Sequence, residues 1–585
     1  MAVTEDAVVE AYDSQFADNR AHGLLALDRA QIILNRIISQ GNDFNGLVLF
    51  DDAQAIVTHS QFIGNGRSGL QGDDSTQFTI DNVNSRANAR GFALYNSAQV
   101  KAINSQFMSN KWQGLLAQGN VKLILSGVTS QSNTWGLTLF DSVEVEANNS
   151  QFIGNRLDGF HAAGNIYHLS LYNVTCQNNT RNGLLLGGGG QAQISNSRFE
   201  NNGNDGLQAI DNIRLVLTNI TSQNNNRIGL YLSLNSEPPT EVSDSQFLNN
   251  GWDGLGILGN TQVALKNITS QANKRHGLFL ASTAKVYAVN SRFITNQEHG
   301  LAAQYYTRLI LNNVTSQGNT SDGLFLAGAS QAQVSDSWFT GNGDDGVHAE
   351  NSTDLSLFNV ISQDNADVGL VLLDDAQAKV SNSQLINNRW DGLLIGTNAR
   401  LSLNDSTLSR NSAWGLAMYA APCFEGLNVA THPAIQITGS GNEIRDNGHG
   451  FWFTISGRKQ LGDGIGNLCP GPRKFAWPAG LAIPYILKVQ FPTTVTVGQP
   501  QTGTIEFIDS DGGLTEVNFE IVQGDLKMIQ VLPGLSFDPQ MRHKAQGVIP
   551  FSVVVKQPQS VKLRVIIMDK GGNQSRPVEF AFEAL

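Results

Sequence analysis

The chain has 585 residues, of which 15% are charged, 41% are hydrophobic and 59 are glycines. Its formal net charge of −12 excludes nucleic acid as the main partner, because phosphate recognition needs a dense basic surface. The apolar content is too high for a disordered chain, and no stretch is long and apolar enough to span a membrane. The N-terminus lacks the charged-then-apolar layout of a signal peptide, so we expect a cytosolic protein or, preferably, a mature form whose leader has been removed.

A glycine followed by Leu, Phe or Val recurs along most of the chain. Its spacing is 23 residues, with excursions only to 22, 24 and 25. Apolar residues alternate with other residues inside each unit, as in the segment 285–289, and this is the periodicity of a β-strand. Three short strands and three turns fill about 23 residues, which is one coil of a parallel β-helix. At about 4.8 Å per coil, about 18 coils predict a rod on the order of 85 Å long. The glycines are Gly23, Gly46, Gly69, Gly91, Gly114, Gly136, Gly159, Gly183, Gly206, Gly229, Gly254, Gly277, Gly300, Gly323, Gly346, Gly369, Gly392 and Gly415.

An asparagine precedes each of these glycines by three or four residues, from Asn19 and Asn42 to Asn388 and Asn411. Asparagine tolerates the left-handed backbone of a tight turn. Stacked asparagine side chains can also form hydrogen bonds with each other along the rod. The pattern therefore predicts a structural asparagine ladder.

Phenylalanine and small residues alternate at one position of the coil. Phe occurs once every two coils, as at Phe247 and Phe293, and the coils between carry a small residue in the equivalent turn, as at Ser270. The true repeat is therefore a two-coil unit of about 46 residues, in which large and small side chains interdigitate along the rod. Cys176 occupies one of the small positions, which predicts a buried cysteine.

The repeat N-S-Q-F-x-x-N-x-x-x-G-L resembles the repeats of right-handed parallel β-helix proteins, the architecture of the pectate-lyase-like superfamily. The resemblance covers roughly residues 6–455. It implies an all-β protein, namely a single-stranded right-handed β-helix of about 18–19 coils over residues 1–420. Members of that group include pectate and alginate lyases, polygalacturonase-like hydrolases, alginate epimerases, phage tailspikes and surface adhesins.

The coil spacing breaks after Gly415. Residues 421–480 are expected to form the last coil, the C-terminal cap and a linker, with a disulfide between Cys423 and Cys469 suspected there. Residues 481–585 contain about seven short alternating segments, which predict an Ig-like antiparallel β-sandwich. DSDGG at 509–513 is predicted to be a hairpin turn; a calcium site at Asp509 and Asp511 is the alternative. Otherwise we expect no cofactor and no metal.

The residues just before the glycines form the first candidate site. Arg181, Arg227 and Arg275 lie two positions before their glycines in alternate coils, with Trp252 between two of them. Arginines about 10 Å apart match the spacing of two sugar residues, so an acidic polysaccharide could bind along them. Asp253, His276 and His299 lie one position before their glycines and are the associated catalytic candidates. The alternative is a solvated edge in which these arginines and aspartates pair with each other.

The segment GNGDDGVH supplies the other candidates, Asp344, Asp345 and His348. Its GDD resembles the paired-carboxylate segment of polygalacturonase-like hydrolases, in which two acids flank the scissile bond. GHG at 448–450 resembles the histidine segment of that family, but it lies about a hundred residues too far along the chain. The N-T-D and R-I-K companions of that family are missing, as is the D-P-H segment of alginate epimerases.

Two functions follow from these patterns. The first is an extracellular or cell-surface rod with a structural, adhesive or polysaccharide-contacting role, which the uniform coils favour: LNSEPPTE (234–241) and GGGG (187–190) add only a residue or two. The second is a polysaccharide lyase, glycoside hydrolase or epimerase acting on an acidic polysaccharide. Polysaccharide or another copy of the chain is the expected partner. Since the sequence begins inside a coil, either a cap precedes it or another subunit covers the first β-edge.

Overall fold

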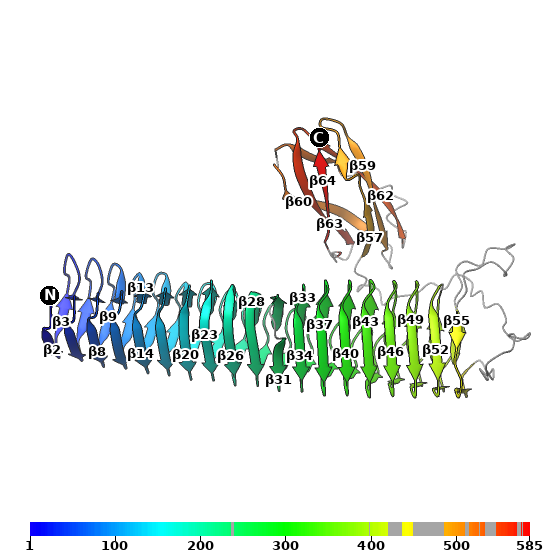
Figure 1. The fold of residues 1–585 in the computed structure, drawn as a ribbon, viewed down its shortest axis with the longest axis horizontal. Helices are drawn as coiled ribbons and strands as arrows, with labels where there is room; N and C mark the ends of the chain where they lie inside the picture. The colour runs from blue at the N-terminus through cyan, green and yellow to red at the C-terminus, as the bar shows by residue number, and fades with distance from the viewer. Residues whose placement is uncertain are drawn as a thin grey trace, which may run out of the picture. The chain divides into compact units, whose positions relative to one another are not determined.

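The computed structural model describes residues 1–235, 239–396, 398–418, 436–448, 485–508, 514–525, 527–532, 546–569, 575 and 577–585. The regular structure of these residues consists of β-strands (Figure 1), which confirms the all-β prediction. The chain divides into two compact units, 1–468 and 469–585. The predicted disulfide of Cys423 with Cys469 and the calcium candidates Asp509 and Asp511 lie outside the described residues.

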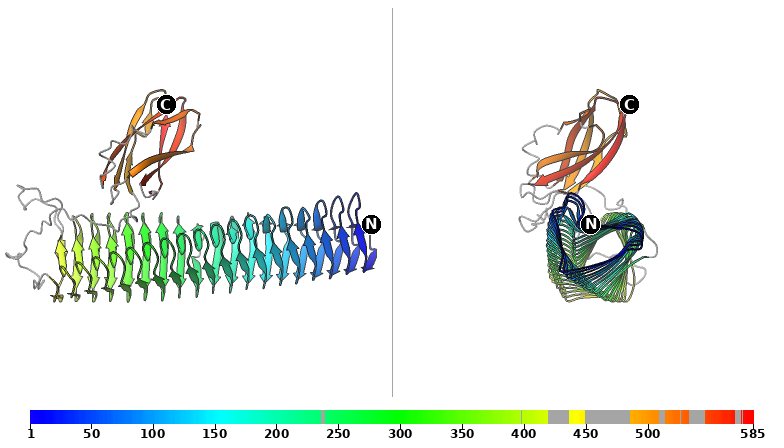
Figure 2. Two further views of the ribbon diagram at one scale, coloured as in Figure 1. Left: turned by 180° about the vertical axis from the view of Figure 1, so that it is seen from behind. Right: turned by 90° about the vertical axis from the view of Figure 1, so that its left-hand side faces the viewer.

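The first unit is a parallel β-helix in which each coil contributes one strand to each of three sheets, here named A, B and C. One coil consists of β36 (Leu278–Ala281), β37 (Lys285–Val289) and β38 (Arg292–Ile294). The next coil repeats it with β39 (Leu301–Gln304), β40 (Arg308–Asn312) and β41 (Thr315–Gln317). Corresponding strands pair in parallel, so the coils superpose when viewed along the rod (Figure 2).

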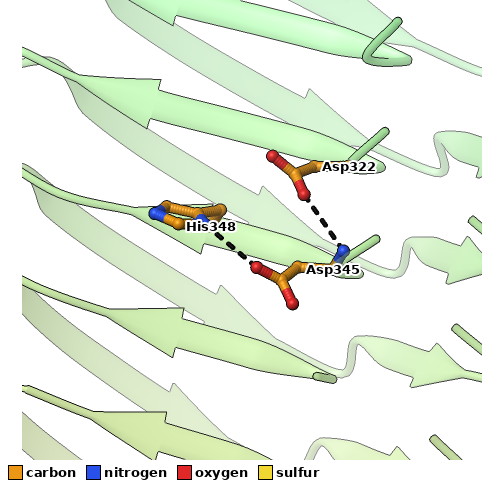
Figure 3. Close-up of side chains that lie close together, drawn as sticks. All are labelled: Asp322, Asp345 and His348. Atoms are coloured by element: carbon orange, nitrogen blue, oxygen red, sulfur yellow. Dashed lines mark hydrogen bonds and ion pairs between the residues drawn. The ribbon is translucent and has the colours of Figure 1, made fainter. Parts of the chain in front are cut away.

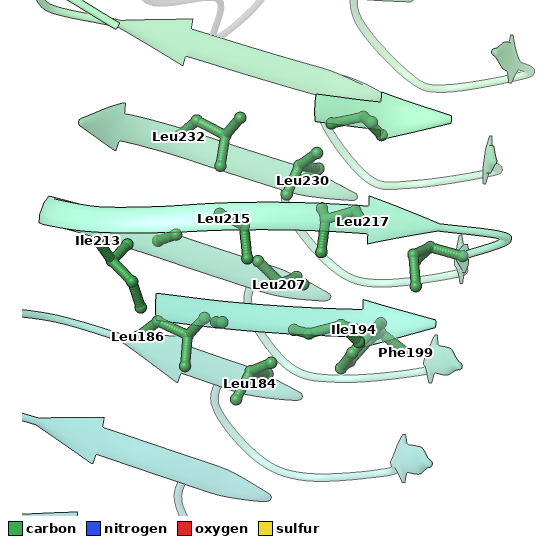
Figure 4. Close-up of a cluster of buried hydrophobic side chains, with 14 of the residues drawn as sticks. Leu184, Leu186, Ile194, Phe199, Leu207, Ile213, Leu215, Leu217, Leu230 and Leu232 are labelled. Atoms are coloured by element: carbon green, nitrogen blue, oxygen red, sulfur yellow. The ribbon is translucent and has the colours of Figure 1, made fainter. Parts of the chain in front are cut away.

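The core of the β-helix is one continuous cluster of inward-facing Leu, Ile, Val, Ala and Phe side chains. Alternate residues of each strand point inward, as the period-two pattern predicts. Figure 4 shows Leu184, Leu207 and Leu230 on successive strands of sheet A, packed against the side chains of sheets B and C. Because every coil buries its apolar residues against its two neighbours, the rod is stabilised by stacking.

The predicted asparagine ladder is confirmed. The Asn250 and Asn273 side-chain amides donate hydrogen bonds to the carbonyl oxygens of the next asparagine along the rod, at 3.0 and 2.9 Å. From Asn42 onward, each ladder asparagine also donates to a backbone carbonyl of the preceding coil, as Asn273 does to Phe247 at 3.1 Å. The expectation of a left-handed backbone at the ladder position is wrong. Positive φ occurs one residue earlier, at Asn249 (53°) and Ala272 (55°), which leaves each ladder side chain free to point inward.

The Phe/Ser alternation is also confirmed, although these residues lie in the short strands of sheet C rather than in turns. Phe293 and its equivalents from Phe62 to Phe339 are fully buried, whereas Phe16 in the first coil is half-buried. In the coils between, the serine hydroxyl donates to the carbonyl of the glycine that opens sheet A, as from Ser270 to Gly277 at 2.8 Å. Gly277 has no room for a side chain: a Cβ atom there would lie 2.6 Å from the carbonyl oxygen of Gly300 and 3.1 Å from the Phe293 ring. This close approach explains the recurrence of glycine. Cys176 takes a serine position and is buried, as predicted.

The second unit contains two four-stranded sheets with a common hydrophobic core. One sheet has the order β57-β59-β62-β61 and the other β58-β64-β63-β60. Most pairs are antiparallel, but β58 and β64 pair in parallel. Ig-like topology stays a prediction for this unit. The strands are β57 (Tyr485–Gln490), β58 (Thr494–Val495), β59 (Gln501–Ile508), β60 (Leu514–Gln523), β61 (Ile529–Leu532), β62 (Gln546–Val555), β63 (Gln559–Asp569) and β64 (Val578–Ala584).

Candidate ligand-binding edge of the β-helix

The candidate site lies at the turns that lead from sheet C into sheet A. The residues two and one positions before the recurring glycine occupy these turns, directly ahead of strands β30 (Leu230–Leu234), β33 (Leu255–Leu258) and β36. Because sheet A pairs in register, equivalent turn residues of successive coils are stacked along one line. We call this line, from residue 227 to residue 299, the arginine edge.

Trp252 lies between two arginines of the arginine edge. The guanidinium carbon of Arg227 lies 4.5 Å from the centre of the Trp252 ring, and that of Arg275 lies 5.7 Å from it. The tryptophan remains 40% exposed. Cation–π attraction holds these groups together and fixes the ring at the surface. The predicted neighbourhood of these three residues is therefore confirmed.

Arg275 also belongs to a charged network with Asp253, His276 and Glu298. Its guanidinium lies 3.6 Å from a Glu298 carboxylate oxygen and 4.0 Å from an Asp253 oxygen, while Nε2 of His276 lies 2.9 Å from Glu298. Burial raises the pKa of Glu298, but the charge and hydrogen bond of His276, together with Arg275, outweigh it and hold that pKa well below its usual range. Glu298 is thus a stable anion that fixes the direction of Arg275.

The aspartates one position before the glycines are not the solvated edge that the sequence suggested as an alternative, because their side chains are buried. One oxygen of each accepts the backbone N–H of the equivalent residue in the next coil. Asp205 accepts from Ile228 at 3.0 Å, and Asp253 accepts from His276 at 3.1 Å. These aspartates accept hydrogen bonds from backbone N–H groups in the turns, which have no partner in a neighbouring strand. Their first role is therefore structural.

Histidine and phenylalanine rings form a stack that continues past the arginine edge. The rings of His276 and His299 have centroids 5.2 Å apart, and those of His299 and Phe325 are 4.9 Å apart, both at 12° between planes. Phe279 joins one end of the stack and His348 the other. Tight ring contact limits the freedom of His276 and His299 to move toward a substrate.

The GDD segment brings its carboxylates and histidine together. His348 lies on β45 (Val347–Ala349), and its Nδ1 is 3.0 Å from Oδ2 of Asp345 (Figure 3). Asp322, one coil earlier, accepts the backbone N–H of Asp345 at 3.0 Å. Burial lowers the pKa of His348, but the hydrogen bond to Asp345, the Glu350 carboxylate 3.6 Å from Nε2 and the charge of Asp322 raise it well above its usual value. The histidine is therefore a cation at neutral pH.

Asp344 has an unusually high pKa for a carboxyl group. Burial and the negative charges of Asp322, Asp345 and Asp367 raise the pKa of Asp344 to about 9, so this carboxyl group carries a proton at neutral pH. Potential ligand atoms of Asp344, Asp345 and Asp367 lie within 4.8 Å of one another, as do those of Asp322, Asp345 and His348. Carboxylate oxygens at this spacing could hold a hard divalent cation, which would release the proton of Asp344.

The Asp344→Asn substitution is expected to raise stability at alkaline pH. The pKa of Asp344 is about 9 in the folded protein against an ordinary 3.8, so the folded state binds more protons than the unfolded state between these values. Stability therefore falls as pH rises through this range. Allowing for the partial exposure of the side chain, the variant should be more stable than the wild type by about 1–3 kcal/mol at pH 9.

Thermal unfolding of the Asp344→Asn variant and the wild type from pH 5 to pH 9 measures this effect. The curves should meet at acidic pH and diverge at alkaline pH. Asp354→Asn, which changes an exposed carboxylate on the neighbouring strand β46 (Asp354–Phe358), is the matched control. Parallel curves for wild type and Asp344→Asn would contradict the protonated state.

Sequence reasoning placed some residues correctly and missed others. Arg181 is exposed and lies two coils before Arg227, with Asn204 in the coil between, so it does not join the tryptophan. Asp367 and Glu350 were missed. Asp367 follows Asp344 by the coil length of 23 residues, and this spacing could have identified it.

Comparisons with known proteins agree with this architecture. The sequence matches the family described as "Right handed beta helix region" over residues 2–134, 113–274 and 276–447, whereas a search of curated proteins finds no match. A search for membrane-spanning segments finds no helix of sufficient length and hydropathy among the described residues.

The solved structures that match the chain are distant. The A-module of the mannuronan C-5 epimerase AlgE4 from Azotobacter vinelandii is 13% identical, with 68% of this chain and 91% of that chain covered and a TM-score of 0.26. A variant of the periplasmic alginate epimerase AlgG is 12% identical, with 63% and 78% covered and a TM-score of 0.24. The SrpA adhesin of Streptococcus sanguinis is 13% identical, with 18% and 58% covered and a TM-score of 0.15. These likenesses carry no information on function. The family match spans nearly the whole coil array, and the chain belongs to the right-handed β-helix family.

Proposed function

We propose that this protein is a non-catalytic rod that binds an acidic polysaccharide along the arginine edge. The observation that carries the proposal is the state of Arg227. Its guanidinium is stacked on Trp252 yet forms no hydrogen bond or ion pair with any residue that the structure describes, and its Nε is buried without a partner. An oriented, unpaired guanidinium is suited to receive a carboxylate or sulfate from a ligand.

The surroundings of Arg227 fit a sugar polymer. The exposed face of Trp252 can stack on a pyranose ring, because aromatic rings present a large apolar surface with little conformational freedom to lose. Arg275, one coil beyond Trp252, is held by Glu298 and Asp253 and adds a second positive charge to the arginine edge. Two arginines that flank one aromatic ring, in coils about 10 Å apart, match an acidic polymer whose charges recur along its length. Acidic polysaccharides of this kind are extracellular, and we place the rod outside the cell or at its surface.

Arg227→Ala and Trp252→Ala are each expected to weaken binding of the acidic polysaccharide about tenfold, which corresponds to the loss of about 1.4 kcal/mol. Biolayer interferometry with immobilised polygalacturonate, alginate, hyaluronan and chondroitin sulfate, and with neutral dextran, measures the affinity. Binding should also fall as salt is added.

Trp390→Ala is the matched control for this experiment. Trp390 also lies two positions before its glycine and is 43% exposed, but the equivalent residues of the adjacent coils are Asp367 and Ala413. Its replacement should leave binding unchanged. Equal affinities for wild type and Arg227→Ala, or equal binding of dextran, would remove the arginine edge from the function.

A polysaccharide hydrolase or lyase is the second candidate, and one observation favours it. Asp344 holds a proton at neutral pH beside Asp345, and a carboxyl group that stays protonated at neutral pH can act as the general acid in the cleavage of a glycosidic bond. Incubation with the same polysaccharides, followed by reducing-end and unsaturated-product assays, distinguishes the candidates. Turnover that disappears in the Asp344→Asn variant would establish the enzyme, whereas binding without turnover supports the rod.

A further inference from the structure

A second surface feature lies at the turns that lead from sheet A into sheet B. Strand β23 (Ile166–Tyr172) contains one more residue than β20 (Val143–Asn148) and as many as β26 (Gly189–Ser195). Its pairing shifts register on both sides, between Ile166 and His168 against β20 and between Ile166 and Leu169 against β26. The bulge directs Tyr167 outward, where it is 76% exposed. Such bulges re-aim a side chain at the cost of regular pairing.

The glycine run of the next coil forms the wall beside Tyr167. Gly188 and Gly190 have φ values of 83° and 115°. A Cβ atom on Gly190 would lie 1.5 Å from the carbonyl oxygen of Ile166, and one on Gly188 would lie 2.2 Å from that of Gly164. The run adds no residue to its coil, and it permits this backbone path directly against the coil of Ile166. A groove of about 620 Å³ lies beside Tyr167.

The groove is lined by polar side chains without partners. Arg214 comes from β28 (Leu207–Thr218), which continues from sheet A into sheet B. Asn165, Gln191 and Asn212 contribute amide groups. Within the described ranges, none of these four side chains forms a hydrogen bond or an ion pair. A surface groove therefore combines one aromatic ring, one free guanidinium and three free amides.

We infer that this groove is a second, independent saccharide-binding site that accepts one acidic sugar residue. The Tyr167 ring provides a face for the pyranose, the amides provide donors and acceptors for its hydroxyl groups, and Arg214 provides a forked donor for its carboxylate or sulfate. The groove does not depend on the arginine edge. The groove lies at the turns after the strands of sheet A, whereas the arginine edge lies at the turns before them. The groove also belongs to the coils of residues 142–214, and the arginine edge to those of residues 227–299.

The test uses the full chain with the arginine edge disabled. In the Arg227→Ala/Trp252→Ala double variant, isothermal titration calorimetry should still detect binding of at least one acidic tetrasaccharide from a panel of oligogalacturonate, oligomannuronate, hyaluronan and chondroitin sulfate. Adding Tyr167→Ala or Arg214→Gln to this variant should weaken that binding about tenfold. Cellotetraose, which is neutral, should bind at least tenfold more weakly than the acidic probe.

Two substitutions control for general surface effects. Tyr172→Ala removes another exposed tyrosine of β23, outside the groove, and Arg400→Gln removes an exposed arginine at the corresponding position of sheet B in a regular coil. Both should leave binding unchanged, and each variant should unfold at the wild-type temperature.

The experiment distinguishes failure of the groove from failure of the arginine edge. Absence of binding by the double variant, or equal effects of Tyr167→Ala and Tyr172→Ala, would overturn the groove and leave the arginine edge intact. Wild-type affinity in the double variant that is lost with Tyr167→Ala would establish the groove and contradict the arginine edge.

Discussion

Replacement of Asn273 by alanine is expected to destabilise the central coils by about 3–6 kcal/mol, because several buried polar groups lose their partners at once. The Asn273 side-chain oxygen accepts from both the backbone and the side-chain N–H of Asn250, each at 3.0 Å. Its amide donates to Phe247, Ser270 and Asn296 at 2.9–3.1 Å. Alanine satisfies none of these groups, and water cannot reach them from the surface.

Asn19→Ala is the matched control for the ladder. Asn19 donates to Asn42, but it is only half-buried, so its replacement should cost about 1 kcal/mol or less. Repeat arrays open locally, so hydrogen exchange of the peptides around residues 247–300 is the suitable measurement. Equal exchange in wild type and Asn273→Ala would show that the hydrogen bonds of the ladder do not contribute to stability.

Phe293→Ala is expected to cost about 3–5 kcal/mol, the range for a fully buried aromatic side chain. The ring is 0% exposed and packs under Gly277. The coils before and after carry Ser270 and Ser316 at the same position, so no larger neighbour can move into the cavity. Strand pairing on both sides also prevents the backbone from collapsing.

Phe358→Ala provides the comparison, because this ring is 50% exposed on the outer side of β46. Its loss should change stability by no more than about 0.5 kcal/mol. Denaturant titration followed by far-UV circular dichroism measures both variants. A Phe293→Ala protein as stable as Phe358→Ala would mean that the alternation with serine is not required for packing.

The sequence predicted the β-helix well because its signals are periodic. Asn273 and Gly277 recur in every coil and Phe293 in every second coil, and each recurrence reflects one constraint: a buried hydrogen bond, a close backbone approach or a filled core. The arginine edge was predicted in part for the same reason, since in-register stacking places Arg227 and Arg275 on either side of Trp252.

The remaining features depend on three-dimensional contacts that the sequence repeat does not reveal. Asp253 has the residue type expected at a surface, yet it is buried, and its side-chain oxygen accepts a hydrogen bond from a backbone N–H of the next coil. The protonated state of Asp344 depends on carboxylates contributed by three coils. Tyr167 appears in the sequence only as one extra residue in a single coil, and only the register of its neighbours shows that the ring is directed outward.

The pairing of one phenylalanine coil with one serine coil restricts how this rod can change length. Removal of a single coil would bring two rings, or two hydroxyls, face to face at the junction. Removal or insertion of two coils preserves the alternation of ring and hydroxyl across the new junction. Between Phe16 and Ser362 the rod can therefore lengthen or shorten by gene duplication in steps of about 10 Å, whereas beyond Ser362 the same position carries Leu385, Leu408 and Ile444 and imposes no such step.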